Sequence, residues 1–317
     1  MGREADKRWL GTEDRSARLR RIEKLDPERD CREITQLFYA DFGTVMILQA
    51  VSGFLMTFAA PRMSRILGAT GQLEHHVAKR FVDTALLFRY PLEHGLGPGP
   101  GRDAARRVNA MHRRYDIHQD DFVMVGCDVP LTALDFAGRF GWRPVTEIER
   151  EALARYYGEV GRAFGSHRPL PTSIDEMSQF WNRYLDTQLA FEPQNRRMAD
   201  AVLDHVASMM PVALRPFLKP LLLAQVDPRI VRACGLRIPS ALTRRLSTAA
   251  FGRLGQTDPV PDGAPDGLEA LARGVYPDGF DLDALGTPTG PPGAGSVSVL
   301  HDVPEADPAD EAGRGPA

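Results

Sequence analysis

The chain has 317 residues, of which 43% are hydrophobic and 26% charged, the usual composition of a globular protein. Its net charge of −3 gives no support for nucleic-acid binding, which needs a concentrated basic surface. Three cysteines without a C-x-x-C pair exclude a zinc knuckle and covalent c-type haem attachment, and they favour a reduced, cytoplasmic setting.

The first 60 residues predict a charged leader followed by two helices. Residues 1–26 are rich in charged side chains and show no secretory signal, so we expect a solvated leader or a surface helix. A helix is predicted from residue 27 or 28 to 40. Residues 43–60 are apolar but interrupted by polar side chains, and a membrane span needs about 20 mostly apolar residues. We therefore predict a buried core helix there, with peripheral membrane contact as the alternative.

A turn region is expected over 62–71, followed by a helix over 77–88. In this helix Arg80 and Thr84 are four residues apart, which places them on one face. The glycine- and proline-rich stretch 95–101 predicts a loop, because neither regular structure tolerates this composition.

A helix over 105–115 carries His112 on its apolar face, which is marked by Val108, Met111 and Tyr115 at spacings of three and four. An inward histidine opposite an inward arginine and threonine suggests a buried site for an anionic cofactor with a metal. Taken alone, a histidine on such a face is more often a hydrogen-bonded core residue.

The remaining pattern is helical up to about residue 254, with no alternation typical of strands, so we predict an all-α protein. Thr146 and Glu149 fit a capping box, and Ser173 with Glu176 repeats it. The tail 256–317 is dominated by Asp, Pro, Gly and Ala and is predicted to be disordered. The runs 267–272 and 296–300 are possible exceptions.

The order of these motifs resembles the catalytic domain of the rubber oxygenase (latex-clearing protein) and MpaB-type oxygenases. The resemblance extends from about Asp30 to Leu254, within a helical catalytic domain predicted over 27–255. Its motifs are Arg80-x-x-x-Thr84, Met111-His112, Asp121-Phe122, the stretch 141–150, and Leu170-Pro171-Thr172 before Trp181.

The resemblance implies a haem b held without covalent attachment in a globin-like helical core, surrounded by additional helices. His112 would be the proximal iron ligand, and Arg80 and Thr84 would line the haem pocket as binding and catalytic residues. Where the rubber oxygenase carries a lysine that can cap the iron, this chain has Asp83, which is a third catalytic candidate. Glu74 is a candidate for that enzyme's catalytic glutamate.

The sequence therefore predicts a cytoplasmic, haem b-dependent oxygenase that acts with dioxygen on a hydrophobic, lipid- or terpenoid-like molecule. Two alternatives remain open: a haem-binding sensor or carrier without turnover, and a non-haem helical protein associated with lipid or membrane. Other candidates are a surface metal site of His75, His76 and His94, and a solvated basic face of Arg106, Arg107, Arg113 and Arg114. One arginine of this face is a candidate partner for a propionate.

Overall fold

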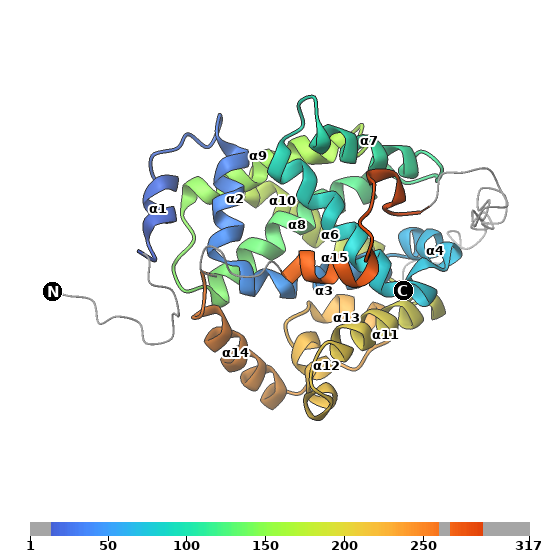
Figure 1. The fold of residues 1–317 in the computed structure, drawn as a ribbon. Helices are drawn as coiled ribbons and strands as arrows, with labels where there is room; N and C mark the ends of the chain where they lie inside the picture. The colour runs from blue at the N-terminus through green and yellow to red at the C-terminus, as the bar shows by residue number, and fades with distance from the viewer. Residues whose placement is uncertain (1–13, 260–266, 288–317) are drawn as a thin grey trace, which may run out of the picture.

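The computed structural model describes residues 14–259 and 267–287, and all regular structure in these ranges is helical (Figure 1). The predicted all-α class is confirmed, while the globin-like arrangement of the core stays a prediction. The helices are α1 (Ala17–Ile22), α2 (Cys31–Asp41), α3 (Gly43–Ala59), α4 (Pro61–Thr70), α5 (Gln72–His75), α6 (Val77–His94), α7 (Pro100–His112), α8 (Gln119–Phe140), α9 (Glu147–Ala163), α10 (Ile174–Gln188), α11 (Pro193–Ser208), η1 (Val212–Leu214), α12 (Arg215–Leu223), α13 (Pro228–Ala233), α14 (Ala241–Gly255), α15 (Gly267–Val275) and η2 (Leu282–Ala284).

The apolar helix α3 forms the centre of the fold and packs against α8 and α11. Its side chains Val51, Leu55 and Phe58 are buried. Since the burial of each such side chain contributes about 1.5–3 kcal/mol, this helix is a main source of stability. The predicted core helix is confirmed. None of the helices in the described ranges has the length and apolar character to cross a bilayer.

A buried arginine fixes helix α9 against α2. The Arg143 guanidinium donates to Asp41 at the end of α2 and to both carboxylate oxygens of Glu149 in α9. Glu149 also completes the predicted capping box with Thr146, which is confirmed. Arg143 thus binds both buried carboxylates, and Arg18 Nη1 lies 3.6 Å from the other oxygen of Asp41. These contacts fix the start of α9, and α9 also packs against α7.

Two of the local predictions are wrong. Residues 62–71 form the helix α4 and not a turn region, since Pro61 suits the first helical position and Gly71, at φ +63°, ends the helix in the left-handed conformation. The loop predicted over 95–101 is shorter, because α7 already begins at Pro100, again with proline in its first turn.

Part of the predicted tail packs against the helical body. Gly267–Val275, which includes one of the two runs marked as exceptions, forms α15 and contacts α6. Asp83 on α6 binds the same segment by accepting hydrogen bonds from the Tyr276 hydroxyl and the Gly286 amide. The run 296–300 and residues 1–13 of the leader lie outside the described ranges.

Candidate functional site

His112 is the last residue of α7, and its ring orientation is set by the end of α9. Its Nδ1 lies 3.0 Å from the carbonyl oxygen of Phe164, so Nδ1 carries the proton and donates it. The ring edge also meets Phe122, with centroids 5.3 Å apart. Burial lowers the pKa of His112, and the nearby charge of Arg80 lowers it further. At neutral pH the imidazole is thus uncharged, and its Nε2 presents a lone pair.

Arg80 and Thr84 lie one turn apart on α6, as predicted, and bind each other. The Arg80 Nη1 donates to Thr84 Oγ1 at 2.7 Å, and this hydroxyl donates to the Arg80 carbonyl oxygen at 2.7 Å. Burial lowers the pKa of Arg80. Within the described ranges no carboxylate lies at ion-pair distance from its guanidinium. The structure therefore brings a neutral imidazole, a desolvated guanidinium and a hydroxyl into one region.

Phe164 connects the two helices of the site, a role that the sequence did not predict. Its carbonyl binds His112, while its ring packs edge-on against Phe88 of α6 with centroids 5.2 Å apart. The next residue, Gly165, has φ +113°, and a Cβ there would lie 3.2 Å from Asn109 Oδ1. A glycine after a helical pattern is a common helix stop, but a backbone carbonyl acceptor leaves no signal in the residue types.

Asp83 forms its hydrogen bonds with other residues than Arg80 and Thr84, although its charge acts against the lowering of the Arg80 pKa. Its buried carboxylate is paired with Lys79 and accepts hydrogen bonds from the C-terminal segment. Arg107 has a similar role: it is buried, not solvated as predicted, and donates to the carbonyl oxygens of Leu285 and Thr287. Both residues hold residues 276–287 against α6 and α7, and this contact accounts for their burial.

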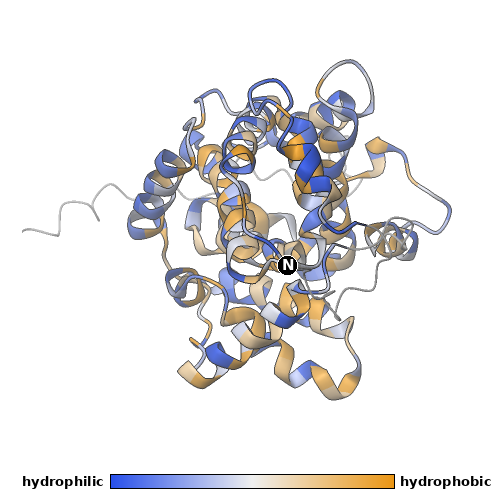
Figure 2. Ribbon diagram, turned by 90° about the vertical axis from the view of Figure 1, so that its left-hand side faces the viewer, coloured by the Kyte–Doolittle hydropathy of each residue, from blue (hydrophilic) through white to orange (hydrophobic). Residues whose placement is uncertain are grey.

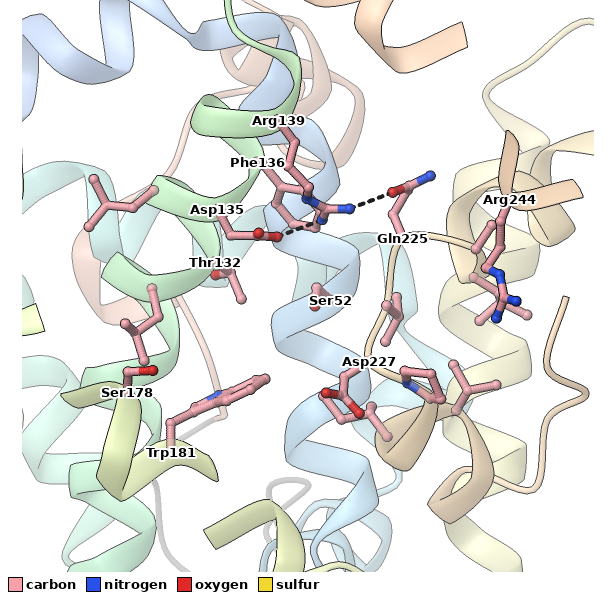
Figure 3. A pocket seen from close by; sticks show the side chains of 18 of the residues that line it. Ser52, Thr132, Asp135, Phe136, Arg139, Ser178, Trp181, Gln225, Asp227 and Arg244 are labelled. Atoms are coloured by element: carbon pink, nitrogen blue, oxygen red, sulfur yellow. Dashed lines mark hydrogen bonds and ion pairs between the residues drawn. The ribbon is translucent and has the colours of Figure 1, made fainter. Parts of the chain in front are cut away.

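A cavity of about 660 Å³ lies elsewhere, between α8, α10 and the α12–α14 region (Figure 3). Trp181 and Ser178 lie on one side, and Arg139 spans the opening by binding Asp135 and Gln225. Trp181 Nε1 donates to Asp128 at 2.9 Å. Burial raises the pKa of Asp128 to about 6. None of the residues that line this cavity belongs to the His112 region.

A family comparison matches residues 38–257 to the catalytic domain of ER-bound oxygenase mpaB/B' and rubber oxygenase. The match covers well over half of the chain. The chain belongs to this family. Membership supports an oxygenase, an oxidoreductase enzyme, and it agrees with the resemblance carried by the Arg80, Thr84 and His112 motifs.

Two curated members of the MpaB/rubber oxygenase family are similar to the chain. It is 23% identical over 202 residues to the ER-bound oxygenase mpaB of Penicillium roqueforti (strain FM164), covering 58% of this chain and 67% of that protein. It is 22% identical over 226 residues to ER-bound oxygenase mpaB' of Penicillium brevicompactum, covering 66% of this chain and 53% of that protein. The matched region thus spans about half to two thirds of these relatives.

The remaining candidate residues of this MpaB/rubber oxygenase family member are Glu74 and the histidines of the predicted surface metal site. Glu74 pairs with Arg197 at 2.9 Å. His75 and His76 are exposed. Nowhere in the described ranges do three or more His, Cys, Asp or Glu side chains gather as metal ligands.

Proposed function

We propose that the chain is a haem b-dependent oxygenase that uses dioxygen on a hydrophobic, lipid- or terpenoid-like molecule, with His112 as the proximal iron ligand. One observation carries this proposal: a neutral imidazole with its Nε2 available lies near a half-buried guanidinium that has no carboxylate at ion-pair distance in the described ranges. Haem needs only one side-chain ligand, and its carboxylates need a cation.

The donor set of this chain fits such a group. The hydrogen bond from Nδ1 to the Phe164 carbonyl fixes the tautomer that leaves Nε2 for iron, and it makes the imidazole a better donor. Metal-ligating histidines commonly use a backbone carbonyl in this way. When bound, haem would supply the reaction with dioxygen, while the protein supplies the axial ligand and the polarity of the site.

Arg80 and Thr84 would orient the anionic and polar groups of the ligands. Both Arg80 and His112 remain half-buried, although desolvation is the main influence on the pKa of each. Each side chain is thus largely removed from water but still has accessible surface, so a ligand such as haem can contact it. A guanidinium held there at 2.7 Å from Thr84 would bind a propionate or polarise an oxygen ligand.

The test is the absorption spectrum and iron content of the purified full chain after haem supplementation, with oxygen uptake measured on a panel of apolar molecules. We expect a Soret band, about one iron per chain, and oxygen consumption with some member of the panel. His112→Ala should lose the haem, whereas the exposed His76→Ala should keep it. No Soret band would contradict haem binding, and a Soret band without oxygen uptake would indicate a sensor or carrier.

The cytoplasmic setting also stays a prediction. Both curated relatives are named as ER-bound, so the location of this chain needs its own measurement.

A further inference from the structure

Large apolar side chains lie exposed on η1, α12 and α14. Val212, Leu214 and Phe217 are 72%, 49% and 65% exposed, and Leu242 and Leu246 of α14 are 67% and 58% exposed. We call these five residues the α12/α14 surface, since α12 and α14 pack against each other. Because α12 contacts both η1 and α14, these exposed side chains lie on adjoining elements. Exposed apolar groups gathered in this way mark interaction sites in soluble proteins.

The α12/α14 surface lies at the edge of the molecule opposite α7, the helix that carries His112 (Figure 1). Figure 2, turned about the vertical axis, shows that the helices along this lower edge are largely hydrophobic with hydrophilic residues between them. The surface is therefore separate from the proposed haem site and needs another explanation.

The segment that carries the α12/α14 surface is rich in basic residues, although the whole chain has a net charge of −3. Residues 205–257 contain eight lysines and arginines and one acidic residue, Asp227. Lys219 and Arg229 are paired with carboxylates. The exposed arginines that have no carboxylate partner within the described ranges are Arg215, Arg232, Arg237, Arg244, Arg245 and Arg253.

The sequence of α14 places both kinds of side chain on one face. Leu242, Arg245, Leu246 and Ala249 recur at spacings of three and four, and all are exposed. Ser247, on the other face, is buried and donates to the Leu221 carbonyl at the end of α12. The face with Ser247 packs against the protein, so the opposite face exposes leucines and arginines to solvent.

We propose that the α12/α14 surface docks the protein on the anionic face of a lipid bilayer. Phe217, Leu242 and Leu246 would enter the boundary between headgroups and acyl chains, and the arginines would contact lipid phosphates and carboxylates. Exposed apolar side chains flanked by arginines supply the two contributions that hold peripheral proteins on anionic membranes, namely buried apolar area and electrostatic attraction to lipid headgroups. A symmetric contact between two copies is disfavoured, since it would bring like-charged arginines together.

The test is co-sedimentation of the full chain with vesicles of phosphatidylcholine alone and of phosphatidylcholine with phosphatidylserine. We expect binding to the anionic vesicles that weakens as salt is raised, because salt screens exposed charges. Arg244→Gln with Arg245→Gln should weaken binding by about fivefold for each arginine removed. Phe217→Ser with Leu242→Ser should also weaken binding, by removing the inserted apolar groups, and it should leave the helical circular dichroism unchanged.

Matched controls separate the α12/α14 surface from general effects of charge and hydrophobicity. Arg102→Gln with Arg106→Gln removes the same charge from the exposed side of α7, and Leu271→Ser removes an exposed leucine from α15. Both should bind vesicles like the unaltered chain. Equal binding to the two vesicle types, no binding at all, or a dimer that Phe217→Ser with Leu242→Ser dissociates would each overturn the proposal.

Discussion

The imidazole Nδ1 of His112 and the carbonyl oxygen of Phe164 lie 3.0 Å apart, so the end of α9 orients the proposed iron ligand at the end of α7. Because the acceptor belongs to the backbone, most substitutions at position 164 would keep it. The conformation of the next residue matters more. Gly165 adopts φ +113°, a conformation that other residues rarely take.

Gly165→Ala should therefore weaken haem binding. The new Cβ would lie 3.2 Å from Asn109 Oδ1 in a strained backbone conformation, which displaces the carbonyl from His112. Loss of such a supporting bond typically lowers metal affinity by about 10- to 100-fold. Haem titration measures the effect, and Gly158→Ala in α9 is the control, since a Cβ there meets open space. Equal affinity in the two variants would contradict the role of the Phe164 carbonyl.

Replacing Arg80 should affect stability and haem binding in opposite directions. Arg80→Met removes a charge that burial disfavours and that has no carboxylate at ion-pair distance in the described ranges, so the haem-free protein should become more stable to unfolding. Haem affinity should fall, because the cation for a propionate is lost. Urea unfolding and haem titration measure the two quantities. A destabilised protein with unchanged haem affinity would indicate a structural role for Arg80.

The haem-free protein should lose stability as pH falls below about 6.5. The pKa of His112 is lowered from 6.5 in the folded state, so below that pH the unfolded chain binds a proton that the folded protein does not bind. Unfolding free energies between pH 5 and 8 should show this slope, and His112→Gln should reduce it. An identical pH dependence in the variant would mean that His112 titrates normally.

Asp128→Asn should stabilise the protein at neutral pH. The pKa of Asp128 rises from 3.8 to about 6, so ionisation above pH 6 costs the folded state about 3 kcal/mol. An asparagine oxygen can still accept from Trp181, whose Nε1 lies 2.9 Å from the carboxylate. The gain should be largest at pH 8 and small at pH 4. A loss of stability at both pH values would show that the carboxylate serves the fold in its charged form.

Asp83→Ala should loosen the segment 267–287 without abolishing haem binding. The substitution leaves the Gly286 amide and the Tyr276 hydroxyl without their acceptor. Limited proteolysis should cut this segment faster in Asp83→Ala than in the control Asp103→Ala, whose carboxylate is exposed on α7. Loss of oxygen uptake with an unchanged cleavage rate and an unchanged Soret band would instead support the catalytic role predicted from the sequence.

The sequence predicted the helical class and the shared face of Arg80 and Thr84, because helix periodicity determines both. It also predicted the cap at Thr146, since a capping box is a local pattern. It did not predict the partners of Asp83 and Arg107, which lie about 180 to 200 residues away in the chain. Contacts of that kind depend on packing and on backbone acceptors, neither of which is visible in the spacing of residue types.

The attachment of residues 276–287 by Asp83 and Arg107 bears on how the protein should be dissected. A fragment trimmed to the family match, ending at residue 257, would remove the partners of Asp83 and Arg107 that lie in residues 276–287, beside the proposed haem helices. A loss of stability or haem binding in such a fragment would result from the truncation and not from the oxygenase domain itself. Fragments for expression or crystallisation should therefore extend at least to Thr287.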